Sequence, residues 1–268
     1  MNAKNSISQE LRDGLKELRL PTIRQCYEEA ARGAENESLT YEEFLLTLVQ
    51  RERENRRQNR EERYLRISRL PVGKTKDSLE IKRFPPKVRH RIKALLSGYF
   101  IDKHENVLIF GNPGSGKTHI ASAIGHELIY KSRKVYYVSC SKLVQDLLIA
   151  KRDLRLSKYI KKLLGFSAVI IDDIGYVQQS REEMEVLFTF LAERYERGSV
   201  IITSNLPFSQ WEKVFKDPMT AAAAIDRLVH HCTILELNLP SYRLECAKKL
   251  GLIDLESNNK GGEKTTDA

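Results

Sequence analysis

Five short apolar runs in the second part of the chain place the strongest constraint on its fold. They are NVLIF (106–110), KVYYVS (134–139), SAVIID (167–172), SVIITSN (199–205) and TILELN (233–238). Their continuous apolarity indicates strands buried on both faces, as in a parallel sheet that is covered by helices on each side. Segments with helix start signals separate them, such as Ser180 followed by Glu183 ahead of an apolar helix. The sequence therefore predicts an α/β fold with a parallel sheet flanked by helices.

A glycine-rich segment, GNPGSGKTHI, lies between the first of these runs and the helical segment ASAIGHELIY. It fits the pattern G-x-x-x-x-G-K-[ST] in the strand–loop–helix context that this phosphate-binding motif needs. Lys117 adds positive charge for the β- and γ-phosphates, and the hydroxyl of Thr118 suits Mg²⁺. The expected nucleotide-contacting residues are Gly111, Asn112, Pro113, Gly114, Ser115, Gly116, Lys117, Thr118 and His119. An ordinary glycine-rich turn is the alternative, and the context favours a nucleotide site.

Polar residues follow two further apolar runs. In AVIIDDIG (168–175), Asp172 is placed to hold Mg²⁺ through water, and Asp173 is placed to orient the attacking water. Asn205 follows SVIITS, where an amide at the carboxyl edge of the sheet can reach the γ-phosphate or the lytic water. Each local pattern is also typical of a simple turn. The order of the three elements along the chain favours the catalytic interpretation.

The first 70 residues predict a small all-helical domain. Leu11, Leu15 and Leu18 follow helical periodicity, and Pro21 marks a break before a second helix. TYEE at 40–43 is a capping box before a third helix that continues through an arginine-rich stretch. The predicted organisation is a helical domain for DNA or a partner (1–70), a linker with a connecting helix (71–103), a sheet domain (104–255) and a disordered tail (256–268).

Composition narrows the class of protein. Lys and Arg number 45 against 36 Asp and Glu, and the resulting charge of +9 favours a polyanionic partner. The four cysteines are scattered, which argues against a disulfide framework or a zinc site and for a reducing compartment. No apolar run approaches the roughly 18 residues that span a bilayer, and the N-terminus lacks the apolar core of a signal peptide. We expect a soluble, cytoplasmic protein that does not bind membranes.

The chain resembles a known family along most of its length, from about residue 10 to residue 250. The matching segments are TIRQCYEEAARGAENESLTYEEFLLTLVQRERENRRQNR, GNPGSGKTHIASAIGHEL, IIDDIGY, VIITSNLPFSQW, AAAIDRLVHHC and SYRL. They resemble the IstB-like transposition helper ATPases of insertion elements, which are related to DnaC-type helicase loaders. The resemblance implies a P-loop AAA+ ATPase core over residues 104–255, with ATP and Mg²⁺ as its ligands.

The same resemblance implies roles for five residues in catalysis. Lys117 and Asp173 belong to this set, and Asn205 is similar to the sensor-1 residue of AAA+ proteins. Arg227 in IDRL resembles an arginine finger that reaches the ATP of a neighbouring subunit, and Arg243 in SYRL resembles a sensor-2 arginine. Many AAA+ proteins carry glutamate at the position of Asp173, whose carboxylate is one methylene shorter. We therefore expect slow ATP hydrolysis, modulated by DNA, that acts as a timer.

The stretch RERENRRQNREERYLRISRL (51–70) predicts a DNA-binding surface. On a helix, five arginines fall within an arc of about 120°, whereas Glu54, Glu61 and Glu62 are expected to point elsewhere. The five are Arg53, Arg56, Arg57, Arg60 and Arg63. A guanidinium matches phosphate geometry, and no residue indicates base reading, so binding to duplex DNA should be mostly sequence-independent. A solvated helix surface and a protein-docking surface are the alternatives. A second basic run, KRDLRLSKYIKKL (151–163), lies between the second and third apolar runs. The resemblance implies that it faces the nucleic acid, and an exposed helix surface is its alternative.

These expectations combine into one function. The chain is expected to be a helper ATPase of an insertion-element transposition system that assembles with ATP on duplex DNA as a homo-oligomer. It would deliver target DNA to its cognate transposase and stimulate that enzyme. A DnaC-type helicase loader, acting on a replicative helicase, is the main alternative. A small-molecule kinase with a P-loop is a third alternative. Such an enzyme would need neither Arg227 nor the basic helical domain, so these features argue against it.

Overall fold

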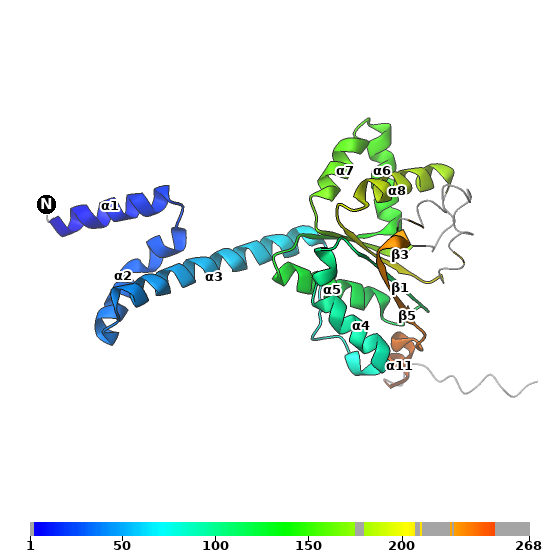
Figure 1. The fold of residues 1–268 in the computed structure, drawn as a ribbon, viewed down its shortest axis with the longest axis horizontal. Coiled ribbons are helices and arrows are strands. Elements are labelled where there is room, and N and C mark those ends of the chain that lie inside the picture. The colour runs from blue at the N-terminus through cyan, green and yellow to red at the C-terminus, as the bar shows by residue number, and fades with distance from the viewer. Residues whose placement is uncertain (1–2, 175–179, 207–209, 211–225, 227, 250–268) are drawn as a thin grey trace, which may run out of the picture. The chain divides into compact units, whose positions relative to one another are not determined.

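The computed structural model describes residues 3–174, 180–206, 210, 226 and 228–249 (Figure 1). The chain divides into two compact units, Met1–Arg66 and Ile67–Ala268. Two of the predictions fall outside the described residues, namely the arginine finger at Arg227 and the tail 256–268.

Three helices build the first unit: α1 (Ala3–Glu17), α2 (Pro21–Glu37) and α3 (Tyr41–Ser68), of which the last two residues belong to the second unit. Pro21 takes the first turn of α2, where its missing N–H leaves no bond unmade. The predicted capping box begins α3, since Thr40 Oγ1 accepts from the Glu43 amide at 3.2 Å and Glu43 Oε2 accepts from the Thr40 amide at 2.8 Å. The all-helical character of this segment agrees with the sequence.

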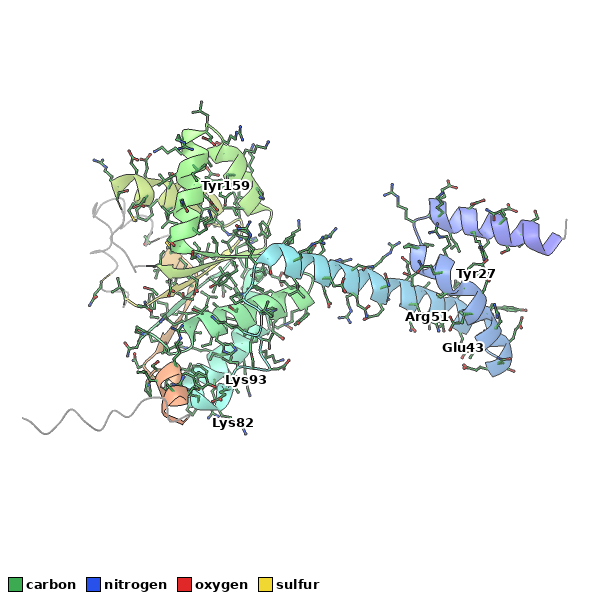
Figure 2. The ribbon with its side chains drawn as sticks, turned by 180° about the vertical axis from the view of Figure 1, so that it is seen from behind. Tyr27, Glu43, Arg51, Lys82, Lys93 and Tyr159 are labelled. Atoms are coloured by element: carbon green, nitrogen blue, oxygen red, sulfur yellow. The ribbon has the colours of Figure 1, made fainter. Side chains whose placement is uncertain are left out.

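The helices of this unit share a small core, and their side chains are drawn in Figure 2. Its buried members are Leu15, Ile23, Ala30 and Leu48. Only part of the apolar face predicted for α1 is covered, because Leu11 and Leu18 stay 45% and 70% exposed.

A buried carboxylate ties α2 to α3 within this unit. Glu52 Oε2 accepts from the amides of Thr22 and Ile23, at 2.9 and 3.1 Å, and Oε1 accepts from Arg56 Nε at 2.8 Å. Burial by itself raises the pKa of Glu52, but the bonds from Arg56 and the two amides outweigh it and lower the pKa. Arg56 also donates to the carbonyl of Arg19, so this guanidinium is part of the helical packing.

Five parallel strands form the sheet of the second unit, where the apolar runs predict them. They are β1 (Asn106–Gly111), β2 (Val135–Ser139), β3 (Ala168–Ile174), β4 (Ser199–Ser204) and β5 (Cys232–Leu237). Their order is β2-β3-β4-β1-β5. In this register Leu108 lies opposite Ile202 on β4 and Ile234 on β5. The predicted α/β class with a parallel sheet is confirmed.

Helices cover both faces of this sheet. The helices of this unit are α4 (Pro86–Leu96), α5 (Lys117–Tyr130), α6 (Cys140–Arg152), α7 (Leu156–Leu164), α8 (Arg181–Arg194) and α11 (Tyr242–Lys249), with short turns η1 (Ile81–Arg83) and η2 (Tyr99–Ile101). Figure 1 shows α6, α7 and α8 on one face, and α4 and α5 on the other. The second basic run spans the end of α6, the turn after it and α7; Arg155 at the N-cap of α7 and Lys158, Lys161 and Lys162 within α7 are exposed. None of the described helices is long and apolar enough to cross a bilayer.

The strand order determines where the predicted site residues meet. β1 lies between β4 and β5, and β3 lies beside β4, so the carboxyl ends of β1, β3 and β4 are neighbours. The register between β3 and β4 shifts between Ile171 and Ile174, and Asp173 in this interval has a left-handed φ of 59°. This irregularity sits at the edge of the sheet where ligands bind in open α/β folds.

Candidate nucleotide-binding site

The glycine-rich loop joins β1 to α5 in a conformation that needs glycine. Gly116 caps α5 at φ 104°, and Gly114 has φ 79°. A Cβ on Gly114 would lie 2.0 Å from Ser241 Oγ, so a larger residue has no room there. The Tyr242 amide donates to the Gly114 carbonyl at 3.0 Å, which places the start of α11 against the loop. The first amides of an α-helix have no acceptor within the helix, so the start of α5 is suited to bind phosphate.

Lys117 is buried and turned into the loop. Its Nζ donates to the carbonyls of Gly111 and Asn112, at 2.8 and 3.0 Å. Burial lowers the pKa of Lys117, while the charges of Asp173 and Asp172 oppose this shift. A cation held by carbonyls beside two carboxylates is available for the phosphates that the loop would cradle.

Asp172 is buried at the end of β3 and accepts from three hydroxyl groups. Thr118 donates to its Oδ1 at 3.0 Å, Thr203 donates to the same oxygen at 2.6 Å, and Tyr137 donates to Oδ2 at 2.5 Å. The Thr118 hydroxyl and the Asp172 carboxylate are hard oxygen donors, which is the donor set that Mg²⁺ takes beside nucleotide phosphates. No cluster of three or more His, Cys, Asp or Glu able to hold a metal occurs among the described residues. The residues present therefore fit a Mg²⁺ that is completed by phosphate and water.

Asp173 differs from its neighbour in both environment and backbone. It lines the cavity described below, and its amide donates to Thr203 Oγ1 at 2.9 Å. Burial and then the charge of Asp172 raise the pKa of Asp173, while Lys117 and Arg243 oppose the shift. A carboxylate with a raised pKa beside a phosphate loop is suited to take a proton from water.

One cavity of about 330 Å³ brings together residues from separate parts of the second unit. Nine of the residues predicted for the site line this cavity: Pro113, Gly114, Gly116, Lys117, Thr118, His119, Asp173, Asn205 and Arg243. Gly111, Asn112, Ser115 and Asp172 belong to the same loop and strand ends, but they do not line this space. The volume lies within the range of sites for small molecules.

The segment expected as a linker supplies a wall of this cavity, a role that no sequence signal predicted. Leu79, Glu80, Arg83 and Phe84 line it from one side, and Tyr242 lines it from α11. Arg83 and Phe84 sit in the stretch LEIKRFPP, which carries no recognised nucleotide motif. An apolar and aromatic wall beside a phosphate loop is suited to hold a planar base.

These two walls hold each other. Tyr242 Oη donates to Glu80 Oε1 at 2.9 Å, and the Arg83 guanidinium carbon lies 5.1 Å from the centre of the Tyr242 ring. Arg83 also forms an ion pair of 2.9 Å with Glu245. His119, on α5, contacts the same segment through Ser78 Oγ at 3.1 Å. Residues 75–84 and α11 are thus joined around the cavity.

Comparison with known proteins identifies the family. The model of the family described as IstB-like ATP binding protein matches residues 13–250. The chain belongs to this family. A Sinorhizobium fredii protein, named for its insertion sequence and for ATP binding, is 41% identical over 87% of this chain and 78% of its own length. The corresponding IS21 protein of Pseudomonas aeruginosa is 35% identical over 89% of this chain and 90% of its own.

Solved structures share the α/β fold of this IstB-family chain. AMPPCP-bound DnaA from Aquifex aeolicus superposes with a TM-score of 0.55 at 17% identity, over 69% of this chain and 57% of that one. The DnaC helicase loader superposes with a TM-score of 0.50 at 19% identity, over 66% of this chain and 99% of that one. At these identities the likeness concerns the fold alone. It agrees with the AAA+ core that the sequence predicted.

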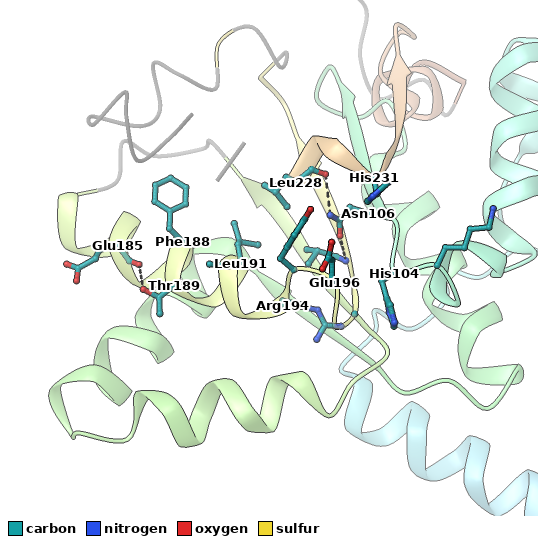
Figure 3. Close-up of a pocket in the computed structure, with 15 residues that line it drawn as sticks. His104, Asn106, Glu185, Phe188, Thr189, Leu191, Arg194, Glu196, Leu228 and His231 are labelled. Carbon is teal, nitrogen blue, oxygen red and sulfur yellow. Dashed lines mark hydrogen bonds between the residues drawn. The ribbon is translucent and has the colours of Figure 1, made fainter. Parts of the chain in front are cut away.

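A second cavity of about 570 Å³ in this IstB-family chain lies at the opposite edge of the sheet (Figure 3). It borders the amino ends of β1 and β4, where Asn106 and Arg194 stand in its wall. The buried Arg194 donates to the carbonyls of Leu163, Phe166 and Ser199 at distances from 2.8 to 3.1 Å. Burial lowers the pKa of Arg194 to about 10. No residue predicted for the nucleotide lines this cavity.

The arginine surface of the helical unit differs from its prediction in one respect. Glu54 and Glu61 do not point away from the arginines, because both form ion pairs with Arg57, at 2.8 and 3.0 Å. On a helix, residues three and four positions apart are neighbours, and a helical plot alone understates how far these long side chains reach. Arg63 lies over the Tyr64 ring at 5.4 Å. All five predicted arginines are exposed, but their surface carries acidic partners as well.

Proposed function

We propose that this chain is a Mg²⁺-dependent ATPase of an insertion-element transposition system. The observation that carries this proposal is the single cavity shared by Lys117, Thr118, Asp173, Asn205 and Arg243, in a chain of the IstB-like family. Asp172 does not line this cavity but contacts it through Thr118, whose hydroxyl donates to the Asp172 carboxylate. An arrangement of this kind favours phosphate binding at one side of the cavity and base binding at the other.

The residues divide the chemistry among them. Lys117 and the loop amides would bind the β- and γ-phosphates, and Thr118 with Asp172 would hold Mg²⁺, which supplies charge neutralisation when bound. Asp173 would accept a proton from the attacking water, and Asn205 would orient that water or the γ-phosphate. Arg243 reaches the cavity from α11 and would add positive charge to the phosphates. Arg227 would supply a finger to the ATP of a neighbouring subunit in an ATP-dependent homo-oligomer.

The biological role follows from the relatives. Proteins 41% and 35% identical to this chain are named as ATP-binding proteins of insertion sequences, which supports a role in transposition. We propose that the helical unit, with its exposed arginines, contacts duplex DNA or the transposase. The chain would bring target DNA to its cognate transposase and stimulate it. The likeness to the DnaC loader concerns the fold alone and does not favour helicase loading.

The test begins with nucleotide binding. A fluorescent ATP analogue is titrated into the full-length protein and into Lys117→Ala, with Lys103→Ala as a matched control. Lys103 is an exposed lysine beside the second cavity, so its loss should leave nucleotide binding unchanged. Lys117→Ala should weaken binding strongly and abolish phosphate release. Equal binding by Lys117→Ala and wild type would refute this site.

The second step is binding to a labelled duplex and to the matching single strand, with ATP, ADP or no nucleotide. Tight duplex binding that needs ATP, together with stimulation of strand transfer by the cognate transposase, is the expected result. Preference for single strands and no effect on the transposase would favour the helicase-loader alternative instead.

A further inference from the structure

Three hydroxyl groups from three different elements surround the Asp172 carboxylate. Thr118 belongs to α5, Tyr137 to β2 and Thr203 to β4. Thr118 carries a motif role, whereas nothing in the sequence pattern assigns a role to Tyr137 or Thr203. Thr203 is fully buried, and Tyr137 is partly buried. A buried hydroxyl aimed at a carboxylate that would hold a metal fixes the direction of that ligand.

The direction of each bond is settled by chemistry. An ionised carboxylate only accepts, so the Thr203 hydroxyl must spend its single proton on Asp172 Oδ1, at 2.6 Å. Its oxygen is then free to accept the amide proton of Asp173, at 2.9 Å. Thr203 therefore connects the backbone of one aspartate to the side chain of the other.

This connection explains the unusual backbone of Asp173. A φ of 59° is rarely adopted by residues other than glycine, and it occurs where the register between β3 and β4 shifts. The bond to Thr203 holds the Asp173 amide in this conformation, and the Asp173 side chain then borders the cavity. In a regular strand, adjacent side chains point to opposite faces of the sheet. Without the irregularity in β3, Asp172 and Asp173 would therefore not both be directed toward the same site.

We propose that Thr203 and Tyr137 are positioning residues for ATP hydrolysis, a role that rests on the ATPase function proposed above. Thr203 and Tyr137 hold the Asp172 carboxylate in the orientation that receives Mg²⁺. Thr203 also holds Asp173 so that its carboxylate faces the attacking water. Neither residue lines the cavity proposed for the nucleotide.

The test uses substitutions that remove one hydroxyl at a time. Thr203→Val keeps the shape and loses both bonds, Thr203→Ser keeps the hydroxyl, and Tyr137→Phe removes only the bond to Oδ2. Tyr136→Phe is the matched control, because Tyr136 is the adjacent tyrosine of β2 and packs against Phe166 in the core, with ring centres 5.2 Å apart. Binding of a fluorescent ATP analogue is measured in EDTA and across a Mg²⁺ titration, and phosphate release is measured alongside it.

Tyr137→Phe and Thr203→Val should bind the analogue in EDTA as wild type does, but need about tenfold more Mg²⁺ for the metal-dependent gain in affinity. Thr203→Val should also hydrolyse ATP about 10- to 100-fold more slowly, and Thr203→Ser should recover most of that rate. Tyr136→Phe should keep the wild-type Mg²⁺ requirement even if its thermal stability falls.

Wild-type Mg²⁺ dependence in both Tyr137→Phe and Thr203→Val would overturn the inference, as would a Thr203→Ser variant as slow as Thr203→Val. If Thr203→Val does not fold, Tyr137→Phe and Thr203→Ser decide the matter. A failure of the ATPase proposal looks different, because wild type itself would then show no Mg²⁺-dependent binding and no loss on Lys117→Ala.

Discussion

Two adjacent aspartates show how neighbouring residues of one type acquire different chemistry. Asp172 is buried and accepts hydrogen bonds from three hydroxyl groups, which fix the orientation of its carboxylate. Asp173 borders the cavity and has a raised pKa, caused first by burial and then by the charge of Asp172. Asp172 is therefore suited to serve as an oriented metal ligand, and Asp173 is suited to exchange a proton.

This difference predicts the outcome of substitutions at Asp173. Asp173→Asn keeps the size of the side chain but cannot accept a proton, so ATP hydrolysis should fall about 10²- to 10⁴-fold while nucleotide affinity is retained. Steady-state phosphate release and analogue binding measure the two effects separately. A rate in Asp173→Asn equal to that of wild type would show that this carboxylate is not the base.

The length of the same side chain can be tested independently. If the shorter reach of Asp173 limits the rate, Asp173→Glu should hydrolyse ATP faster than wild type, with no change in binding. A slower Asp173→Glu would mean that the backbone at φ 59° already brings the shorter carboxylate to its working position.

At the scale of elements, the junction of α2 and α3 depends on one buried carboxylate. Glu52 accepts hydrogen bonds from the amides of Thr22 and Ile23 in the first turn of α2 and is paired with Arg56. Glu52→Ala should lower the free energy of unfolding by about 1–3 kcal/mol, because these two amides lose their hydrogen-bond acceptor in a buried position. Hydrogen exchange of these two amides in the full-length protein would show the loss as reduced protection.

The pKa of Glu52 gives this junction a pH dependence. Because its pKa in the folded chain is lowered from 4.5, Glu52 stabilises the folded state above that value, and the contribution disappears as the pH falls through the lowered pKa. Protection of the Thr22 and Ile23 amides, corrected for intrinsic exchange, should decrease below pH 4.5 in wild type and much less in Glu52→Gln. Equal acid sensitivity of the two proteins would contradict this assignment.

Elements were predictable from the sequence where one local signal decides them. The five strands follow from continuous apolar runs, and α3 and α8 begin at capping boxes formed by Thr40 with Glu43 and Ser180 with Glu183. The hydroxyls around Asp172 were not predictable, because Tyr137 and Thr203 lie on different strands and meet only through the strand order. The cavity wall at 79–84 was missed for the same reason, since its contact with α11 joins residues about 160 positions apart.

At the scale of the whole molecule, the charge of +9 favours a polyanion, but individual arginines contribute unequally. Arg57 is offset by two glutamates, and Arg56 is committed to Glu52. Arg53 and Arg63 are exposed on the same helix and form no ion pair with a carboxylate among the described residues. They are the arginines of choice for a test of DNA binding.

Contact with five phosphates would give a slope of log K against log salt of about −4.5. Arg53→Ala combined with Arg63→Ala should make this slope shallower by about 2, whereas Arg57→Ala should change it by less than about 1. Fluorescence anisotropy of a labelled duplex across salt, with ATP present, measures these slopes. A larger effect of Arg57→Ala than of the double variant would show that its ion pairs with Glu54 and Glu61 open on DNA.

Residues 75–84 and α11 contact each other, so the nucleotide cavity lies where two segments far apart in the sequence are connected. Arg83 pairs with Glu245, and Tyr242 bonds Glu80, so a molecule bound between these walls is enclosed by both at once. A chain truncated before Tyr242 would therefore lose the contacts that hold residues 75–84 in place as well as Arg243. For the same reason, a protease should cleave both segments more slowly together when nucleotide is present.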